Sequence, residues 1–503
     1  MPHPSADPIG LPELESRLDH DLACLNWPAK PWVPRRNHDG QAVEDVVIIG
    51  AGQAGLALAF GLAQQGIHAL LLDRAAPGFE GPWATTARME TLRSPKELTG
   101  PAMGIANLTF RAWYEAQHGP DGWALLDKIP RLKWMDYLRW YRKVTRPRIR
   151  NHACVTDIVP HADRVELTVA PATGAPAGAE GHDERVVARR VILATGRDGL
   201  GGPAIPSFMQ GVDRHWWAHS SDEFDYTQLK GKHVGVIGAG ASAMDSAATA
   251  LELGAASVDL LIRRQDIPRI NKAKGAGVLG LTHAHVDLPD DWKWRIRHYI
   301  NTLQVPPPQG STLRVSRHAN AYFHTGCAVI SVQPTGQKQA PLQVRTSLGD
   351  FPLDFLVVAT GFLPDWSQRP EFATFAPHVR LWAERFQPGE QETDTELENS
   401  PDLNDAFGFQ ERTPGCCPGL SRIHAFCYPA SLSFGTISGD IPAISDGARL
   451  LSTRLASLLY REDLDDHWAA LQQYAEPELD GSEWTPADSA QRLRTLQSRI
   501  SSS

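Results

Sequence analysis

The strongest constraint on the fold lies in residues 44–74, EDVVIIGAGQAGLALAFGLAQQGIHALLLDR. The apolar run at 46–49 has the composition of a buried parallel strand and leads directly into a G-x-G-x-x-G pattern. In such a pattern one glycine makes a tight turn, one lets the backbone approach a pyrophosphate, and one lets the next helix pack closely on the strand. The pattern predicts a dinucleotide-binding turn whose cofactor contacts are Gly50, Gly52, Gln53, Ala54 and Gly55.

The residues after the glycines complete this unit. A helix is expected over 54–65, where Gly66 provides a stop, and a second strand is expected over 67–72. That strand ends at Asp73, about 20 residues beyond the glycines, where a carboxylate can bind the ribose hydroxyls of an adenine dinucleotide. Asp73 and Arg74 are therefore predicted as further cofactor contacts. A glycine-rich turn without a ligand is the alternative, but strand, glycines, helix, strand and acid in this order are far more specific than glycines alone.

The same pattern occurs a second time with the opposite charge at its end. A strand expected over 232–237 leads into a G-x-G-x-x-A pattern at 238–243, followed by a helix over 242–253 and a strand over 258–262. This strand ends in two arginines, and guanidinium groups bind a 2′-phosphate that a carboxylate would repel. The first site is therefore predicted to bind FAD or NAD and the second NADPH, although a solvated strand end would explain the arginines as well. The predicted contacts are Gly238, Gly240, Ala241, Ser242, Arg263 and Arg264.

Each dinucleotide pattern is followed, further along the chain, by a strand that ends in Ala-Thr-Gly, at 194–196 and 359–361. This order predicts an α/β fold with two Rossmann-like dinucleotide-binding domains, the NADPH domain inserted into the FAD domain. The expected boundaries are an N-terminal extension (1–40), the first part of the FAD domain (41–215), the NADPH domain (216–358), the second part of the FAD domain (359–465) and a C-terminal tail (466–503). Other helices are expected over 11–25, 110–118, 131–144 and 443–460, a loose surface loop over 388–415, and frayed structure over the last 20 or so residues.

Composition narrows the class of protein. The chain has 503 residues, of which 42% are hydrophobic and 21% charged, and these fractions suit ordinary globular domains. The formal charge of −9 is spread along the chain without a basic run, which argues against nucleic acid or an anionic membrane as a partner. The N-terminus has neither the basic start nor the apolar stretch of a signal peptide, and no apolar run approaches the roughly 20 residues that span a bilayer. Six cysteines without a C-x-x-C motif do not suggest a disulfide framework, so a cytoplasmic location is expected.

With both motifs and both Ala-Thr-Gly segments in this order, residues 44–460 resemble the two-domain (class B) flavin-dependent monooxygenases. That superfamily includes Baeyer–Villiger enzymes, flavin-containing monooxygenases and N-hydroxylases of amines and amino acids. The resemblance implies FAD at the first motif and NADPH at the second. It also implies that NADPH reduces the flavin, that O2 adds at flavin C4a, and that this hydroperoxide transfers one oxygen atom to a small nucleophilic substrate.

The finer match favours one branch of the superfamily. Baeyer–Villiger and flavin-containing monooxygenases carry F-x-G-x-x-x-H-x-x-x-[WYF] before the second motif. Gly211 and His215 keep the G-x-x-x-H spacing, but Phe208 lies one residue too far away, and His219 replaces the final aromatic residue. His219-Ser220 resembles the His-Ser of the flavin-containing branch, while the segment 359–362, Ala-Thr-Gly-Phe, is similar to the A-T-G-Y of N-hydroxylases. The resemblance thus favours N-hydroxylation of an amine or amino acid, with Baeyer–Villiger or sulfur oxidation as the alternative.

The resemblance also suggests which residues contact the cofactors and the substrate. Gly81-Pro82-Trp83 resembles the segment that lies against the flavin, and Asp440 in Gly-Asp-Ile-Pro is expected near the ribityl chain or the ring. For all of these positions, loop packing is the alternative. The candidates for lining the flavin ring are Met89, Ser94, Pro95 and Lys96, and the expected cofactor contacts at the linker are Thr360 and Gly361. The catalytic candidates are Trp83, His219 and Asn271. The substrate candidates are Arg269, Asn271, Lys272, Asn320 and Tyr322, and these five are equally compatible with surface positions.

Two histidine patterns raise the question of a metal. His215 and His219 are four residues apart and could share a helix face, and His283-x-His285 is followed by Asp287. Two ligands are too few for a stable zinc site, so no metal is predicted.

Two other classes of protein share parts of this pattern. A pyridine-nucleotide disulfide reductase has a similar pair of folds, but its chemistry needs a redox pair of cysteines beside the flavin. A non-catalytic dinucleotide sensor would not need two intact phosphate turns with opposite charges at their ends. The expected partners are a small-molecule substrate and O2, and the 15 tryptophans leave room for a homo-oligomer.

Overall fold

The computed structural model describes residues 7–172, 174–175, 183–337 and 340–501. The chain forms two compact units, one ending at Ser457 and the other covering Leu458–Ser503. The smaller unit contains α14 (Leu464–Gln473) and α15 (Ser489–Ile500), whose side chains are almost all exposed. The expected fraying of the last 20 residues is wrong over α15, because the Asp488 carboxylate caps that helix by accepting the Gln491 N–H.

The larger unit is built first on an eight-stranded sheet in the order β4-β3-β2-β7-β6-β5, with β1 paired to β2 and β18 to β7. The strands β2, β3, β4, β7 and β18 are parallel, while β5 and β6 are antiparallel additions at one edge. Helix α2 (Gln53–Gln64) connects β2 to β3, as the first glycine pattern predicts. The strands are β1 (Arg36–His38), β2 (Gln41–Ile49), β3 (Ala69–Leu72), β4 (Arg148–Arg150), β5 (Ala153–Pro160), β6 (Val165–Pro171), β7 (Glu184–Leu193) and β18 (Ile423–Ala425).

Four longer helices accompany this sheet: α1 (Leu11–Cys24), α3 (Phe110–Leu125), α4 (Arg131–Thr145) and α13 (Ile444–Glu462). Helix α4 buries an aromatic stripe that includes Trp134, Tyr137 and Tyr141. Helix α3 is longer than predicted because the chain bends at Gly119-Pro120, where Gly119 has a φ of 69°, and then continues. Across the described parts of the chain, no helix is both long enough and apolar enough to cross a membrane.

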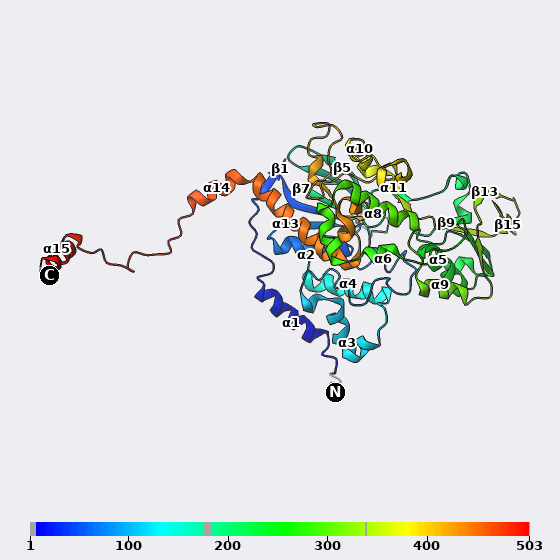
Figure 1. Ribbon diagram of the computed structural model, residues 1–503, viewed down its shortest axis with the longest axis horizontal. Coiled ribbons are helices and arrows are strands. Elements are labelled where there is room, and N and C mark those ends of the chain that lie inside the picture. The colour runs from blue at the N-terminus through cyan, green and yellow to red at the C-terminus, as the bar shows by residue number, and fades with distance from the viewer. Residues whose placement is uncertain (1–6, 173, 176–182, 338–339, 502–503) are drawn as a thin grey trace. The chain divides into compact units, whose positions relative to one another are not determined.

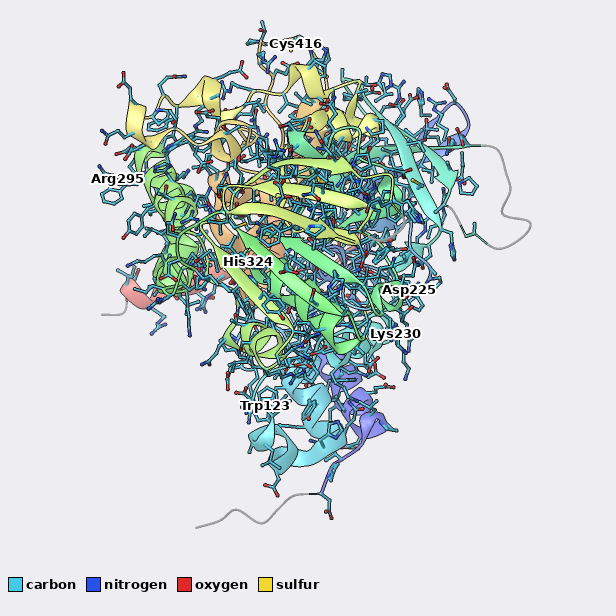
Figure 2. The ribbon with its side chains drawn as sticks, turned by 90° about the vertical axis from the view of Figure 1, so that its right-hand side faces the viewer. Trp123, Asp225, Lys230, Arg295, His324 and Cys416 are labelled. Carbon is cyan, nitrogen blue, oxygen red and sulfur yellow. The ribbon has the colours of Figure 1, made fainter. Side chains whose placement is uncertain are left out.

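The second sheet is fully parallel, in the order β12-β11-β10-β16-β9. Helix α5 (Ala241–Glu252) connects β10 to β11, and α9 (Gln309–Ser316) lies beside α5 (Figure 1). Figure 2 faces this module and labels His324 on the edge strand β12. The strands are β9 (Trp217–His219), β10 (His233–Ile237), β11 (Ser257–Ile262), β12 (Ala321–Thr325) and β16 (Phe355–Val358), and an antiparallel meander adds β13 (Val329–Pro334), β14 (Leu342–Thr346) and β15 (Gly349–Leu353).

The chain passes from the first sheet to the second and back through two adjacent segments. Strand β8 (Gly202–Pro203) pairs antiparallel with β17 (Phe362–Leu363). Beside this pair the Ala204 N–H donates to the Gly361 carbonyl at 2.9 Å. The predicted fold class, two Rossmann-like sheets with one inserted into the other, is confirmed.

The loose surface loop predicted over 388–415 is wrong. This stretch contains α11 (Thr395–Glu398) and several side chains that are fully buried, among them Asp402, Phe407 and Phe409. The buried Asp402 carboxylate forms ion pairs with Arg380 and Arg385. A polar sequence is buried here because its charged side chains find partners from outside the segment.

Candidate functional site

The first glycine turn is closely packed on one side and open on the other. A Cβ atom added to Gly55 would lie 2.0 Å from the Gly50 carbonyl oxygen, and one added to Gly50 would lie 2.5 Å from the Ala194 carbonyl oxygen. A Cβ on Gly52, by contrast, would meet nothing closer than the Gly81 Cα at 3.9 Å. Because Gly52 is also the N-cap of α2 and offers no capping side chain, the first N–H groups of α2 are left for an external anion. This geometry fits a pyrophosphate.

Asp73 is fixed to this turn by two backbone hydrogen bonds. Its Oδ2 accepts the Ala51 N–H at 2.7 Å and its Oδ1 accepts the Ala75 N–H at 2.8 Å. An ionised carboxylate has about four acceptor sites, so each oxygen keeps capacity for a ribose hydroxyl. Arg74 is exposed next to it.

The segment predicted to lie against the flavin does lie at the first glycine turn. Gly81 approaches Gly52, and the Trp83 carbonyl accepts a hydrogen bond from Arg131 at 2.5 Å. Further along, Met89 and Ser94 are half-buried and Pro95 is exposed. Lys96 has a structural role instead, because its ammonium donates to the carbonyls at the end of α3, including Leu126 at 2.6 Å.

Two arginines that the sequence analysis did not single out fasten this segment to the second module. Arg88 donates to the Ser220 carbonyl at 2.9 Å and to the Asp222 carbonyl at 3.0 Å. Arg314, on α9, donates to the Arg88 carbonyl at 3.2 Å and pairs with Glu252 on α5. The segment beside the first turn is therefore held against both sheets.

The second glycine turn repeats the features of the first. A Cβ on Gly238 would lie 2.6 Å from the Ala359 carbonyl oxygen, whereas a Cβ on Gly240 would meet no atom within 4 Å. Gly240 is the N-cap of α5 and supplies no capping side chain, so the first N–H groups of α5 are again left for an anion. Ala241 is buried and Ser242 exposed. Arg263 and Arg264 are exposed directly after β11, as the charge argument requires.

His219 lies beside the second Ala-Thr-Gly segment. It belongs to β9, is paired with Val358 in the register of the sheet, is 1% exposed and packs edge-on against Phe362. Burial lowers its pKa, so the imidazole is neutral near pH 7. His215 and His219 do not share a helix face, because His215 lies in a short 3-10 helix (Arg214–Trp216) and His219 in a strand.

Asn271 caps a short helix rather than standing free. Its Oδ1 accepts the Lys274 N–H at 3.0 Å at the start of α6 (Lys272–Ala276). Of the other substrate candidates, Arg269 pairs with Asp266 at the surface and Asn320 donates to the Ala255 carbonyl. Tyr322 is 48% exposed. None of the predicted substrate residues belongs to the wall of the pocket described next.

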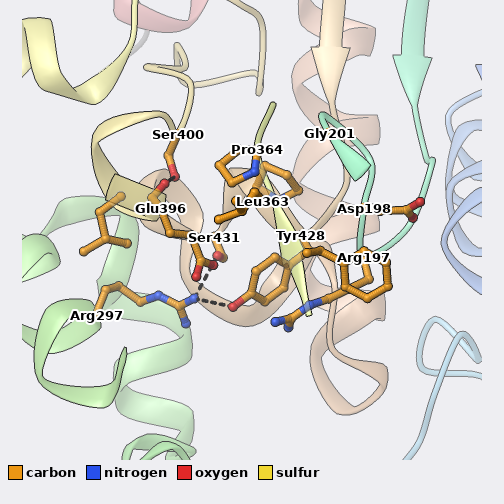
Figure 3. Close-up of a pocket in the computed structure, with 13 residues that line it drawn as sticks. Arg197, Asp198, Gly201, Arg297, Leu363, Pro364, Glu396, Ser400, Tyr428 and Ser431 are labelled. Atoms are coloured by element: carbon orange, nitrogen blue, oxygen red, sulfur yellow. Dashed lines mark hydrogen bonds between the residues drawn. The ribbon is translucent and has the colours of Figure 1, made fainter. Parts of the chain in front are cut away.

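A pocket open to solvent lies at the two segments that join the sheets (Figure 3). Its wall combines residues that follow the first Ala-Thr-Gly, residues that follow the second, and side chains from three other elements. These residues are Arg197, Asp198 and Gly201; Phe362, Leu363 and Pro364; Arg297 of α8 (Asp290–Leu303); Glu396, Leu397 and Ser400; and Tyr428, Pro429 and Ser431.

Two guanidinium groups flank Tyr428 in this pocket. The Arg197 guanidinium carbon lies 3.6 Å from the centroid of the ring, and Arg297 Nη2 donates to the phenol oxygen at 3.0 Å and to Ser431 Oγ at 3.2 Å (Figure 3). Burial acts to lower the pKa of Arg297, but Tyr428, Glu396 and Asp440 together raise it above its usual value. Arg297 is therefore a permanent cation.

Asp440 faces the same two arginines. Burial among neighbouring atoms raises the pKa of its carboxyl group, and the charges of Arg297 and Arg197 oppose that rise. Its side chain is nevertheless open to solvent.

The sequence analysis missed the residues that carry this pocket. Arg197 stands directly after the first Ala-Thr-Gly, which is the signal that could have identified it. Arg297 and Tyr428 lie more than 60 residues away from either linker, and no local pattern marks them.

Metal binding and thiol chemistry find little support in the geometry. Within the described ranges, no group of three or more His, Cys, Asp and Glu side chains could hold a metal ion. His285 is a core residue that contacts the Leu432 carbonyl at 3.1 Å, and burial lowers its pKa to about 4.

All six cysteines lie in the described part of the chain as free thiols. Cys427 packs on the first linker at Gly199, and burial raises the pKa of its thiol to about 12. Such a thiol is not a nucleophile at neutral pH.

Comparison with known proteins agrees with these observations. The chain is 37% identical over 468 residues, 93% of its length, to the "FAD-dependent urate hydroxylase" of Xanthomonas campestris pv. campestris, of which it covers 96%. Residues 44–278 match the family model "Pyridine nucleotide-disulphide oxidoreductase". In fold the chain is similar to the ornithine hydroxylase PvdA of Pseudomonas aeruginosa (TM-score 0.62, 16% identity, 82% of this chain and 99% of that one). It is also similar to the cadaverine monooxygenase DfoA of Erwinia amylovora (TM-score 0.60, 14% identity, 89% and 99%).

These findings identify first a class and then a family. The two sheets have the fold of the two-domain flavin monooxygenases PvdA and DfoA, and the chain is an FAD-dependent oxidoreductase. Within this class, the chain belongs to the family that contains the Xanthomonas FAD-dependent urate hydroxylase. The resemblance inferred from the sequence is confirmed at this level.

Proposed function

We propose that this protein is an FAD- and NADPH-dependent monooxygenase that hydroxylates a small planar oxopurine of the urate class. The substrate class is suggested by the printed activity of the relative that is 37% identical. The observation that carries the proposal is the pocket at the two linkers, where Arg197 and Arg297 flank Tyr428. Fixed guanidinium groups suit a flat anion with carbonyl oxygens.

The cofactor contacts follow from the two turns. FAD would be held by the backbone of Gly50, Gly52, Gln53, Ala54 and Gly55 and by Asp73 and Arg74, with Trp83, Met89, Ser94, Pro95 and Asp440 nearer the ring. NADPH would be held by Gly238, Gly240, Ala241 and Ser242, with Arg263 and Arg264 on the 2′-phosphate and Thr360 and Gly361 at the linker. Reduced FAD, when bound, activates O2 so that one oxygen atom can be transferred to the substrate.

The residues of the chain orient the reactants and exclude water. The segment from Gly81 to Met89 contacts the first glycine turn at Gly52 and is held to the second module by Arg88, which keeps Trp83 near the first turn. His219 is buried and neutral beside Phe362, and it supports the second linker without adding charge. Trp83, His219 and Asn271 stay proposed as catalytic candidates, and the capping bond of Asn271 means that its amide nitrogen is the group left for a ligand.

A second candidate is N-hydroxylation of an amine or amino acid. Glu396 and Asp440 are both close enough to Arg297 to raise its pKa, and the same carboxylates could bind an ammonium group. Baeyer–Villiger or sulfur oxidation would use the same cofactors on an uncharged acceptor. A disulfide reductase-like activity is the remotest alternative, because the thiol nearest the linkers is single and buried.

One experiment separates these functions. The FAD-loaded protein would be mixed with NADPH and O2 while flavin absorbance and O2 consumption are followed, with urate, cadaverine, ornithine, a sulfide and a ketone as additions. We expect urate to accelerate O2 consumption in step with its own disappearance. Stimulation by an amine with formation of a hydroxylamine would support N-hydroxylation instead, and NADPH oxidation that no addition changes would contradict a monooxygenase acting on any of these substrates.

A further inference from the structure

We infer that the pocket at the two linkers is the substrate-binding site, and that Arg297 and Glu396 recognise the edge of a planar heterocycle that alternates N–H and C=O groups. This assignment rests on the proposed monooxygenase function and specifies its site. It is independent of the polar positions near Asn271 that the sequence favoured, none of which lines the pocket.

The position of the pocket suits an oxygen acceptor. Arg197 follows the first Ala-Thr-Gly, and Phe362 follows the second. The first linker packs on the first glycine turn through Ala194, and the second packs on the second turn through Ala359. A molecule in the pocket therefore touches both of the segments that meet the two cofactor turns.

The walls of the pocket differ in character. Phe362, Leu363 and Pro429 provide apolar surface that suits the face of a flat ring. Arg297 and Glu396 provide a donor and an acceptor that suit its edge. Asp198 is already paired with Arg369 at 3.4 Å, so it competes less for a ligand.

Arg297 has hydrogen-bonding capacity left over. Both of its bonds inside the pocket, to Tyr428 and Ser431, come from Nη2. Its Nε is buried and, among the residues the structure describes, has no hydrogen-bond partner. A buried donor without a protein partner is rare, so the guanidinium keeps capacity to bind a ligand carbonyl or ring anion.

The combination of groups selects between substrate classes. An oxopurine offers carbonyl oxygens or a ring anion to Arg297 and ring N–H groups to the Glu396 carboxylate. An aliphatic amine without a carboxylate offers donors alone, so it would pair with Glu396 and give the spare donors of Arg297 no acceptor. The pocket therefore favours the heterocycle over such an amine.

The test is a direct measurement of urate binding by isothermal titration calorimetry on the FAD-loaded enzyme, together with KM and kcat. Arg297→Gln is expected to raise the dissociation constant and KM about 10- to 100-fold, because it removes charge-assisted hydrogen bonds. Arg297→Lys should fall between wild type and Arg297→Gln, since it keeps the charge but loses the planar fork. Glu396→Gln should weaken urate binding and should not improve binding of cadaverine.

The matched control is Arg295→Gln, which changes the same residue type on the same helix at an exposed position outside the pocket. It should leave urate binding within twofold of wild type. FAD content and the circular dichroism spectrum of every variant would be recorded, so a misfolded protein would be recognised. Arg295→Gln should match wild type in melting temperature and in the rate of flavin reduction by NADPH without substrate.

The outcomes are distinct. Loss of binding in Arg297→Gln with binding kept in Arg295→Gln supports the assignment. Wild-type turnover of urate combined with normal urate binding in both Arg297→Gln and Glu396→Gln would overturn it while leaving the proposed function intact. Failure of the wild-type enzyme to bind or oxidise urate, despite bound FAD and reduction by NADPH, would overturn the substrate class of the proposed function and the assignment with it.

Discussion

The Asp73 Oδ2 accepts a hydrogen bond from the Ala51 N–H at 2.7 Å, so the acid at the end of β3 is tied to the glycine turn at the end of β2. The same carboxylate accepts the Ala75 N–H through Oδ1. One side chain thus fixes the end of β3 to the turn that is proposed to hold the pyrophosphate. The acid has a structural role as well as the predicted binding role.

Replacing Asp73 should therefore affect both folding and FAD. In Asp73→Asn, an amide NH2 would face a backbone N–H, and at least one charge-assisted bond of about 1.5–3 kcal/mol would be lost. We expect FAD affinity to fall about 10- to 100-fold and the melting temperature to fall by several degrees. Asp163→Asn, at an exposed position, is the control and should change neither quantity. Normal FAD affinity in Asp73→Asn would contradict the ribose assignment.

The two glycine turns allow each cofactor to be removed separately. Gly52 and Gly240 both have negative φ, and a Cβ at either position would touch no atom closer than 3.9 Å. Gly52→Ala should fold normally but lose FAD, because the methyl group would occupy the space proposed for its pyrophosphate. Gly240→Ala should keep FAD and show a KM for NADPH raised by at least about tenfold.

Gly238→Ala is the comparison variant for Gly52→Ala and Gly240→Ala. Gly238→Ala would bring a Cβ within 2.6 Å of the Ala359 carbonyl at a φ of 129°, so we expect it to lower the melting temperature itself. Circular dichroism melts and flavin absorbance after gel filtration separate the three variants. Unchanged NADPH kinetics in Gly240→Ala would exclude the second turn as the NADPH site.

The arginine at the end of β11 is predicted to distinguish NADPH from NADH. Arg263→Ser should raise the KM for NADPH about 10- to 100-fold through lost contacts to the 2′-phosphate and should leave the KM for NADH almost unchanged. Arg269→Ser changes an exposed arginine in the following loop and is the matched control. Equal effects on the two nucleotides would show that Arg263 does not read the phosphate.

Acid should destabilise the protein through two buried histidines. Burial lowers the pKa of His424 to about 3 and that of His285 to about 4, from about 6.5 in an unfolded chain. Because the unfolded state binds more protons between these values, stability is complete above about pH 6.5 and is lost as the pH falls. Between pH 7.5 and 5 we expect roughly 2 kcal/mol of unfolding free energy to be lost per histidine.

Urea denaturation across that pH range tests the prediction. His285→Gln should flatten the pH dependence, whereas His283→Gln, which changes an exposed histidine two residues away, should not. If wild type, His285→Gln and His283→Gln all show the same pH dependence of the unfolding free energy, protonation of His285 does not contribute to that dependence.

The sequence predicted the elements whose signals are local. Both phosphate turns are marked by a buried strand, fixed glycine spacing and a charged strand end, all within about 30 residues. The second sheet could be placed inside the first because the Ala-Thr-Gly segments recur in order. The helix predicted over 131–144 is present as α4 (Arg131–Thr145).

The parts that sequence could not predict depend on contacts between distant segments. Asp402 looks like a surface residue in a polar stretch, and it is buried only because Arg380 and Arg385 reach it. The pocket joins Arg197, Arg297 and Tyr428 from three separate parts of the chain. No periodic pattern within a single segment indicates that these three residues lie together.

The antiparallel pairing of β8 with β17 has a consequence for the modularity of this protein. The inserted sheet leaves and rejoins the first one through neighbouring, hydrogen-bonded strands, so its two ends form a narrow neck. A two-residue turn of the kind that closes ordinary β-hairpins could bridge that neck. The inserted sheet could therefore be exchanged at this neck without cutting a strand of the main sheet, provided that the replacement keeps hydrogen-bond partners for Arg88.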